Sequence, residues 1–431
     1  MELIELYKLV RGSAGICTDT RSIRQGEIFF ALKGPSHDGN RYATTAVMKG
    51  AVAAITDDKS LNGEKIIVVN DVLKTLTDLA VIHRKALTVP VIGITGTNGK
   101  TTTKELVTSV LSAKGRVHST AGNLNNHIGV PLTLLSAPED TIFLVVEMGA
   151  NHRGEIESLC ETARPTHGII TNIGKAHLEG FGSFDNLIAT KTELYHWLKK
   201  EGGIAFFNER NPLLKELVFK ILNKAVPYSG PSGTDIIVTT ADKDDMFLNV
   251  AVDYQGQKHF FSTNLFGSYN LDNIRAAMAV GIFFGVPFDA IIAAISSYIP
   301  ANNRSQVMKT DSNTLICDSY NANPSSMAKA LASFSSLPAK KKMVILGDML
   351  ELGVDTVVEH KAIVESLDGF GEIEICLVGP NFGSVSNNKK INLFATSGEL
   401  REWLKQTKLS GYTILVKGSR GMMLEKIYDV L

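Results

Sequence analysis

The sequence predicts an α/β protein of three domains, and three observations lead to this prediction. At 431 residues, the chain is too long for one ordinary hydrophobic core. From Val89 onward, short apolar runs alternate with helical stretches, a pattern typical of a doubly wound, mostly parallel sheet covered on both faces. A polar stretch at 300–305 interrupts this pattern before it starts again. We therefore expect domains at 1–88, 89–308 and 309–431.

The composition argues against several classes of protein. Lys and Arg number 44, as do Asp and Glu, so no global field attracts nucleic acid or an anionic membrane. The four cysteines are far apart in sequence and form no disulfide framework or zinc-binding pair. No signal peptide is evident, and the most apolar stretch, 276–288, is too short to span a bilayer. We expect a cytoplasmic monomer with reduced cysteines, no integral membrane segment and no nucleic-acid partner.

The first domain is expected to be a small α/β unit. It has strand-like runs at 26–32 and 66–70, with a helix at 42–51 between them. The polar stretches 19–21 and 37–40 lie in its turns. Such loops bind ligands at the edge of an α/β sheet, but at this point plain turn formation explains these stretches better.

The two later domains follow a regular strand and helix order. In the central domain we expect parallel strands at 91–95, 142–147, 168–171 and 204–208. An antiparallel meander laid on the sheet edge follows at 234–240, 246–252 and 258–263, and then helices at 269–285 and 288–298. The third domain is expected to be Rossmann-like, with strands at 314–317, 343–346, 375–378 and 413–416 and helices at 325–335, 359–366, 399–405 and 422–430.

A glycine-rich loop between the strand at 91–95 and a helix is the most informative motif. Its sequence is Gly96-Thr97-Asn98-Gly99-Lys100-Thr101-Thr102. Backbone N–H groups of such a loop surround phosphate oxygens, the helix start adds its positive dipole, Lys100 adds a charge and Thr101 offers a hydroxyl to Mg²⁺. Ile94 replaces the first glycine of the general Walker pattern, which leaves the shorter Gly-x-x-Gly-Lys-Thr. The alternative is a glycine turn beside a solvated lysine.

Two further residues follow predicted strands of the central sheet. Glu147 ends one strand, and His177 lies in the loop after another. Because the carboxyl ends of parallel strands form the ligand crevice, Glu147 is a candidate ligand of Mg²⁺. His177 is either a second metal ligand or an ordinary hydrogen-bonded loop histidine.

Three charged residues are less informative by themselves. Lys191 has the pattern of a solvated helical lysine. Arg304 and Asp318 lie on either side of the polar stretch at 300–305, where a closing third domain brings them onto a nucleotide. An interdomain ion pair between them is the plain alternative.

Taken together, these motifs resemble the Mur ligase family. The resemblance spans all three domains, and so many motifs in one order make it specific. It rests on the loop at 96–102 and on the segments 122–131, 147–155, 176–183, 270–273, 318–327, 346–353 and 417–421.

The resemblance implies an ATP-dependent peptide ligase of peptidoglycan synthesis. It implies that D-alanyl-D-alanine is joined to UDP-N-acetylmuramoyl-tripeptide through an acyl phosphate, with ATP as co-substrate and Mg²⁺ as cofactor. Both steps gather negative charge, which Mg²⁺, Lys100 and the loop amides stabilise. Domain closure positions the reactants and keeps water away.

The resemblance also implies roles for individual residues. Lys100, Glu147, His177 and Lys191 are the expected catalytic group, with Thr101, Glu147, His177 and a carbamylated Lys191 as metal ligands. Asn270 and Asn273 are expected near the adenine, with Arg304 and Asp318 at the phosphates and ribose. The remaining substrate contacts are expected from Asp19, Thr20, Arg21 and Ser22 for the UDP part, Asn125 and Asn126 for the muramoyl part, and Tyr320, Asn321 and Asn323 for the dipeptide.

Two other functions compete with this one. A folylpolyglutamate synthetase shares the fold and chemistry, but such enzymes usually have serine after a Gly-Lys-Gly segment, whereas here three threonines follow Lys100. A nucleotide-binding regulator without catalysis is the second alternative. The presence of Glu147, His177 and Lys191 argues against it.

Overall fold

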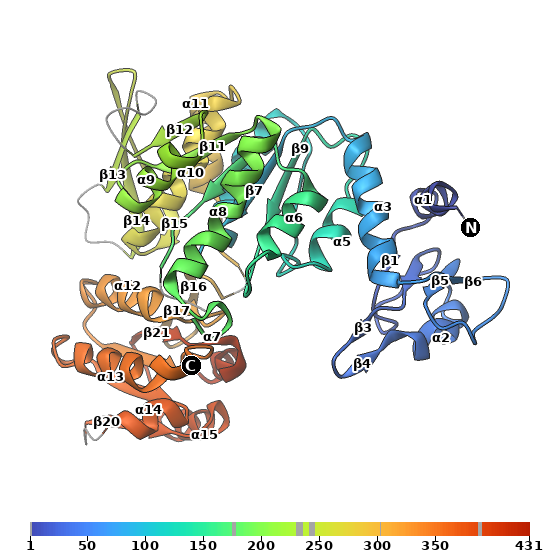
Figure 1. Ribbon diagram of the computed structural model, residues 1–431. Coiled ribbons are helices and arrows are strands. Elements are labelled where there is room, and N and C mark those ends of the chain that lie inside the picture. Colours follow the sequence, from blue (N-terminus) through green and yellow to red (C-terminus); the bar gives the residue numbers. More distant parts are fainter. Residues whose placement is uncertain (1, 175–177, 230–235, 241–245, 302, 387–389) are drawn as a thin grey trace. The chain divides into compact units, whose positions relative to one another are not determined.

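The computed structural model describes residues 2–174, 178–229, 236–240, 246–301, 303–386 and 390–431 (Figure 1). These residues form two compact units, which we describe separately. The first comprises Met1–Gly93, Gly115–Ala150 and Gly154–His167, and the second comprises Ile94–Lys114, Asn151–Arg153 and Gly168–Leu431. The predicted division at 88 and 308 stays a prediction. Within the described ranges, no helix has the length and apolarity needed to cross a bilayer.

The first unit begins with a small parallel sheet, in agreement with the predicted α/β character. Its strand order is β1-β2-β5-β6, with bounds Ile16–Cys17, Ile28–Phe30, Ala53–Thr56 and Ile66–Val68. A short hairpin, β3 (Lys33–Gly34) with β4 (His37–Asp38), follows β2. Helix α1 (Leu3–Arg11) precedes the sheet, and α2 (Ala43–Met48) packs on it through small buried alanines. Alanine lets the helix approach the strands closely.

Helix α3 (Val72–Ala86) carries a buried cation that joins several segments of the first unit. The Arg84 guanidinium donates hydrogen bonds to the carbonyl oxygens of Leu87, Ala163 and Arg164, at 2.5, 2.9 and 3.0 Å. Burial lowers the pKa of Arg84 to about 10. The carbonyls at the end of α6 (Glu155–Ala163) are therefore satisfied by a side chain from α3, against which α6 and α5 (Gly129–Leu135) pack.

The central six-stranded sheet has the order β12-β11-β10-β7-β9-β8. Its described pairings, β11 with β12 and β8 with β9, are parallel, in agreement with the predicted parallel character of the sheet, although β8 and β12 themselves were not predicted as strands. The strands β7 and β9 are buried along their whole length, which is why they read as unbroken apolar runs. In chain order the strands are β7 (Val91–Thr95), β8 (Val117–Ser119), β9 (Phe143–Glu147), β10 (His167–Ile170), β11 (Ile204–Asn208) and β12 (Ala225–Tyr228).

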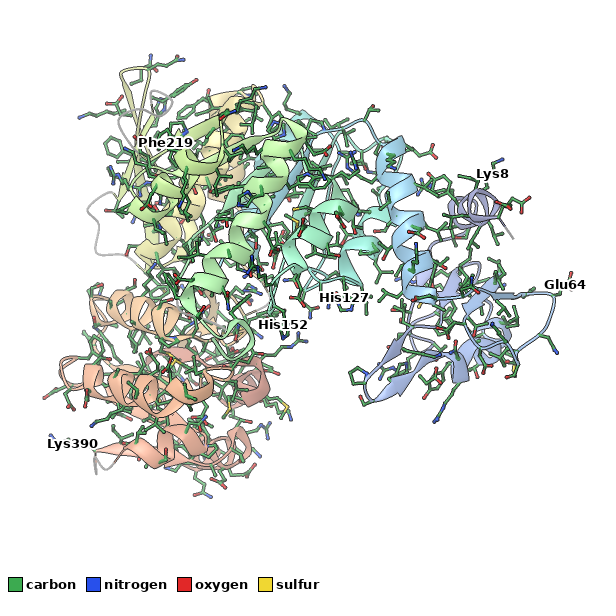
Figure 2. The ribbon with its side chains drawn as sticks, in the orientation of Figure 1. Lys8, Glu64, His127, His152, Phe219 and Lys390 are labelled. Carbon is green, nitrogen blue, oxygen red and sulfur yellow. The ribbon has the colours of Figure 1, made fainter. Side chains whose placement is uncertain are left out.

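Helices and a meander accompany this sheet in the second unit. The meander is antiparallel, as predicted, but forms its own sheet and packs against helices α10 (Leu271–Phe283) and α11 (Phe288–Ser297) instead of extending the sheet edge. Its strands are β13 (Ile236–Thr240), β14 (Phe247–Tyr254) and β15 (Gln257–Phe266). The helices are α4 (Lys100–Leu111), α7 (Leu178–Phe181), α8 (Phe184–Glu201), α9 (Pro212–Ile221), α10 (Leu271–Phe283) and α11 (Phe288–Ser297). Phe219 points outward from α9 and is largely exposed (Figure 2).

The C-terminal sheet has the order β16-β17-β21-β18-β19-β20, in which only the edge strand β16 is antiparallel. The strands are β16 (Gln306–Lys309), β17 (Thr314–Asp318), β18 (Lys342–Gly347), β19 (Glu374–Val378), β20 (Ile391–Phe394) and β21 (Thr413–Lys417). The helices are α12 (Pro324–Ser335), α13 (Thr356–Leu367), α14 (Pro380–Val385) and α15 (Ser397–Thr407). Strands β16 and β20 and helix α14 were not predicted. The α-helix predicted at 422–430 is instead a pair of 3₁₀ helices, Arg420–Met422 and Leu424–Val430.

A buried carboxylate organises one end of this C-terminal sheet. Asp348 is 1% exposed and accepts hydrogen bonds from the backbone N–H groups of Asn381 and Phe382, both at 2.9 Å, at the start of α14. Beside it, His360 Nε2 accepts from the Met349 N–H at 3.0 Å. This carboxylate therefore supplies acceptors that the first turn of α14 lacks.

We predict that Asp348→Ala lowers the free energy of unfolding of the C-terminal part by about 3 kcal/mol, because two buried N–H groups lose their acceptor. Urea denaturation followed by Trp403 fluorescence in a Trp197→Phe background measures this. Asp348→Asn keeps one acceptor oxygen and should lose less. The exposed Asp368→Ala is the matched control; an equal loss in both alanine variants would contradict the assigned role.

Candidate functional site

The glycine loop adopts the predicted strand, loop and helix arrangement, and its shape requires both glycines. Gly96 has φ +139°, and a Cβ there would lie 2.1 Å from Thr171 Oγ1. Gly99 has φ +79° at the start of α4, and a Cβ there would lie 2.5 Å from Asn273 Oδ1. Both positions combine a backbone conformation unfavourable for other residues with a close neighbour. The two glycines that define the sequence motif are therefore required by the steric environment of the loop.

The backbone of this loop is held by the residues that follow β10. The Thr97 N–H donates to the Asn172 carbonyl oxygen at 2.9 Å, and the Asn98 N–H donates to Asn172 Oδ1 at 3.0 Å. The Asn98 carbonyl oxygen in turn accepts from Thr171 Oγ1 at 2.6 Å. The loop is thus shaped by protein contacts before any phosphate arrives. Thr171 and Asn172 were not predicted as site residues, although Thr171 ends a predicted strand of the same sheet and Asn172 follows it.

Lys100 folds back across the loop that it follows. Its Nζ donates to the carbonyl oxygens of Gly96 and Thr97, at 2.7 and 3.1 Å. Thr101 and Thr102 lie in the first turn of α4, where backbone N–H groups have no intrahelical acceptor, and Thr101 is 6% exposed. A cation and the positive end of a helix dipole therefore act on the same loop, which is the chemistry of an anion site.

In the first unit, Glu147 at the end of β9 is 1% exposed. Its Oε1 accepts a hydrogen bond from Asn125 Nδ2 at 2.8 Å, whereas the buried Oε2 has no hydrogen-bond partner among the residues that the structure describes. A buried carboxylate oxygen without a partner is costly unless something else binds it. This oxygen is a suitable ligand for a hard divalent cation, and Asn125 holds the carboxylate in place.

The other predicted muramoyl contact, Asn126, has a local structural role. Its Oδ1 accepts from the N–H groups of Ile128 and Gly129 ahead of α5, at 3.1 and 2.9 Å. The neighbouring His127 is exposed, as is His152 in the loop after β9 (Figure 2). Asn126 therefore shapes the loop that carries it.

Lys191 is buried in α8, contrary to its reading as a solvated lysine. It is 3% exposed, and its Nζ lies 5.6 Å from the centre of the Phe181 ring. A lysine buried to this extent is uncommon. His177 lies outside the described residues. Among the residues that the structure describes, no three His, Cys, Asp or Glu side chains gather as a metal site.

Asn270 and Asn273 form a polar chain that starts at the phosphate-loop helix. Thr103 Oγ1 donates to Asn273 Oδ1 at 3.1 Å, and Asn273 Nδ2 donates to Asn270 Oδ1 at 2.9 Å. Asn270 Nδ2 then donates to the Phe266 carbonyl oxygen at 2.8 Å. Asn270 Nδ2 also donates to Ser305 Oγ at 3.4 Å, and the Tyr269 hydroxyl lies 2.8 Å from the same Ser305 Oγ. Burial raises the pKa of Tyr269 well above its usual value.

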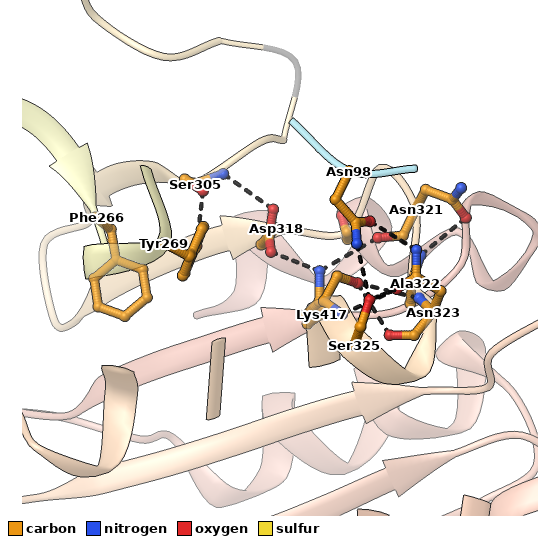
Figure 3. A network of polar contacts seen from close by, with 12 residues as sticks. Asn98, Phe266, Tyr269, Ser305, Asp318, Asn321, Ala322, Asn323, Ser325 and Lys417 are labelled. Carbon is orange, nitrogen blue, oxygen red and sulfur yellow. Dashed lines mark hydrogen bonds and ion pairs between the residues drawn. The ribbon is translucent and has the colours of Figure 1, made fainter. Parts of the chain in front are cut away.

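The Ser305 backbone leads to an ion pair at the ends of two strands (Figure 3). Its N–H donates to Asp318 Oδ1 at 3.1 Å, and Lys417 Nζ donates to Asp318 Oδ2 at 2.6 Å. The side chains of Lys417 and Asp318 are 3% and 15% exposed. The plain alternative of an ion pair between Arg304 and Asp318 is therefore wrong, because Lys417 is the partner. Lys417 was not predicted as a site residue.

Two cations gather on the Tyr320 ring. The guanidinium carbon of Arg304 lies 3.7 Å from the ring centre, and that of Arg420 lies 5.4 Å from it. Asn321, the next residue, is exposed, and its carbonyl oxygen lies 3.3 Å from Lys417 Nζ. This gathering of positive charge on an aromatic ring suits an anionic group.

The polar turn in the first unit is a local structure. Arg21 Nη2 donates to Asp19 Oδ2 at 2.6 Å, and this pairing lowers the pKa of Asp19 to about 2. Ser22 Oγ donates to the Asp19 carbonyl oxygen at 3.1 Å, and Lys49 Nζ donates to that of Thr20 at 2.9 Å. The stretch therefore forms a well-defined exposed turn whose Asp19 carboxylate is already paired.

Family profiles match along the chain: "Mur ligase family, catalytic domain" at 13–94, "Mur ligase middle domain" at 94–281, and "Mur ligase, glutamate ligase domain" at 303–420. The UDP-N-acetylmuramoyl-tripeptide–D-alanyl-D-alanine ligase of Bacillus subtilis is 34% identical, over 96% of this chain and 92% of the relative.

Solved structures agree with these matches. MurF from Acinetobacter baumannii superposes with a TM-score of 0.86 and 28% identity, over 99% of this chain and 97% of that one. MurF ligase from Thermotoga maritima in complex with ADP superposes with a TM-score of 0.85 and 27% identity, over 98% of this chain and 97% of that one. A folylpolyglutamate synthase from Mycobacterium tuberculosis superposes with a TM-score of 0.64 and 14% identity, over 83% of this chain and 94% of that one. This is a likeness of fold alone.

We predict that Gly99→Ala lowers the affinity for ATP at least about tenfold, because the new methyl group displaces Asn273 and the loop must leave its φ of +79°. Isothermal titration with ATP measures this. Gly256→Ala is the matched control, since Gly256 has φ +77° but nothing within 4 Å of its would-be Cβ. Undiminished affinity in the Gly99 variant would contradict the steric argument.

Proposed function

This chain belongs to the Mur ligase family, and from that membership we propose that it joins D-alanyl-D-alanine to UDP-N-acetylmuramoyl-tripeptide at the expense of ATP. The observation that carries the proposal is the preformed phosphate loop, with Lys100 folded over it and both glycines sterically required. Relatives named for this reaction cover almost the whole chain. We place the reaction in the cytoplasm, where both nucleotide substrates are available, and propose a monomer.

The proposed reaction has two steps. The γ-phosphoryl group of ATP passes to the terminal carboxylate of the tripeptide and gives an acyl phosphate and ADP. The amine of D-alanyl-D-alanine then attacks the acyl carbon, phosphate leaves, and the amine proton is lost. Negative charge develops in both steps, and Lys100 with the N–H groups of the loop stabilises it. Enclosure of the reactants keeps water from hydrolysing the acyl phosphate.

We propose that Thr101 and Glu147 bind a first Mg²⁺, and that His177 and the carbamate of Lys191 bind a second metal ion. The unpartnered Oε2 of Glu147 and the burial of Lys191 support this assignment. The metal would neutralise phosphate charge and polarise the phosphoryl group. Carbamylation turns a buried cation into a carboxylate-like anion, which suits a metal site better than an ammonium does.

The remaining residues are proposed to bind the substrates. Asn270, Asn273, Arg304 and Asp318 border the nucleotide, and Asp318 does so while paired with Lys417. The turn at 19–22 receives the UDP part, and Asn125 and Asn126 lie on the muramoyl side. Tyr320, Asn321 and Asn323 receive the dipeptide, and the guanidinium groups on the Tyr320 ring support a site for its carboxylate. The domains proposed for these tasks are 1–88, 89–308 and 309–431.

The two alternatives are less well supported. A folylpolyglutamate synthetase is disfavoured by the low identity of its structural likeness. A regulator without catalysis has no need of a buried carboxylate oxygen such as Glu147 Oε2, which has no hydrogen-bond partner within the described part of the chain.

We predict that the purified protein releases phosphate from ATP only when the UDP-linked tripeptide and D-alanyl-D-alanine are both present, because the acyl phosphate turns over only when an amine captures it. A phosphate-release assay with each substrate omitted in turn measures this. Lys100→Met is the matched negative control, since it removes only the ammonium. Release driven by folate and glutamate would overturn the assignment.

We predict that Lys191→Ala lowers turnover about 100-fold, because the group that holds the metal is lost. Short carboxylates such as acetate should partly restore activity by occupying the vacated space. Lys199→Ala, an exposed lysine of the same helix, is the matched control. Full activity of the Lys191 variant would remove this residue from the mechanism.

A further inference from the structure

The Asn98 side chain leaves the phosphate loop and contacts the segment that begins α12 (Figure 3). Its Nδ2 donates to Ser325 Oγ at 2.9 Å, and its Oδ1 accepts from Asn323 Nδ2 at 2.7 Å. Ser325 Oγ then donates to Asn323 Oδ1 at 2.9 Å. The three side chains thus form a closed ring in which each group donates once and accepts once, and in such rings each bond polarises the next. We refer to these three residues as the Asn98 ring.

The helix cap of α12 fixes the direction of every bond in the ring. Asn323 Oδ1 also accepts from the Ser326 N–H at 2.9 Å, as the N-cap of α12. The oxygen of this amide must therefore face the helix, and its NH₂ group faces Asn98. The Asn98 amide then has one possible orientation, with its own NH₂ group toward Ser325. The N-cap residue Asn323 thus also determines how the Asn98 side chain of the phosphate loop is oriented.

The backbone of Asn98 is held as firmly as its side chain. Thr171 and Asn172 bind its carbonyl oxygen and its N–H from the end of β10. A shift of α12 must therefore either break the ring or move the phosphate loop. The stretch immediately before α12 carries Tyr320 and Asn321, two of the proposed contacts of the dipeptide.

We propose that the Asn98 ring couples nucleotide binding at the phosphate loop to the seating of the dipeptide-binding stretch, with Asn98, Asn323 and Ser325 as positioning residues. Phosphates bound to the loop favour the conformation in which Asn98 completes the ring, and the ring holds the start of α12 in place. Because such coupling is reciprocal, the dipeptide tightens nucleotide binding by the same factor. The proposal rests on the proposed function for the identity of the second ligand only.

The kinetic test compares two serines that are neighbours in the same helix cap. Ser325→Ala removes a ring member, whereas Ser326→Ala removes a hydroxyl that bonds only within the cap. The non-hydrolysable analogue AMP-PNP should strengthen D-alanyl-D-alanine binding in the wild type and in Ser326→Ala. In Ser325→Ala and Asn98→Ala this strengthening should fall about tenfold. The KM for the dipeptide should rise while kcat changes less, and Ser325→Thr should restore coupling.

A double-mutant cycle separates coupling from simple loss of stability. If the ring acts as a unit, Asn98→Ala and Ser325→Ala together should cost no more than Asn98→Ala alone. Fully additive losses, or equal losses in Ser325→Ala and Ser326→Ala, would overturn the proposal. Thermal melts of each variant verify that the protein is folded.

A second measurement does not depend on the dipeptide. AMP-PNP alone should slow hydrogen exchange of the backbone amides at 325–328 in the wild type and in Ser326→Ala, but not in Ser325→Ala or Asn98→Ala. Unchanged exchange in the wild type would overturn the ring as a coupling device. If dipeptide-dependent turnover is absent but the exchange behaves as expected, the proposed function fails and the coupling stands.

Discussion

The absence of a side chain at Gly96 is the constraint on which the rest of the site depends. Because nothing projects from this residue, Thr171 packs directly against the loop, and Thr171 and Asn172 bind its backbone. A loop fixed in this way loses little conformational freedom when a phosphate binds. It also gives Lys100 two carbonyl oxygens to bind, so that its charge stays over the loop.

The polar contacts on the other side of the loop continue this arrangement into the C-terminal sheet. From α4 they run through Asn273 and Asn270 to Ser305, and from there to the paired Asp318 and Lys417. Removing either member of a buried ion pair leaves an uncompensated charge, so this pair holds the ends of β17 and β21 in one arrangement. The Ser305 N–H, in the polar stretch at 300–305, binds Asp318 of this pair, so the position of that stretch depends on the ends of β17 and β21.

Sequence reasoning succeeded where the determinants are local. The strand, loop and helix at 91–111 were predicted because apolar runs flank two glycines whose freedom is needed. The strand β16 was missed because Gln306–Lys309 is a strand only through pairing with β17, and its polar residues suit an edge. The pairing of Asp318 with Lys417 was missed for a similar reason, since these residues are opposite each other only once β17 and β21 are known neighbours. Likewise, the burial of Lys191 depends on tertiary packing that a helical pattern does not reveal.

The chemistry of the ring at Asn98 fits its position beside a phosphate site. A carboxylate in place of Asn323 would repel an incoming triphosphate, and a cation there would compete with the loop for its oxygens. Amide and hydroxyl groups avoid both effects and still specify one geometry, because each donor has one acceptor. The guanidinium groups of Arg304 and Arg420 lie on the Tyr320 ring instead, so the Asn98 ring itself contains no charged group. The uncharged Asn98 ring does not repel a phosphate at the loop, and the two guanidinium groups at Tyr320 attract a second anion. Two anionic ligands can thus bind without one excluding the other.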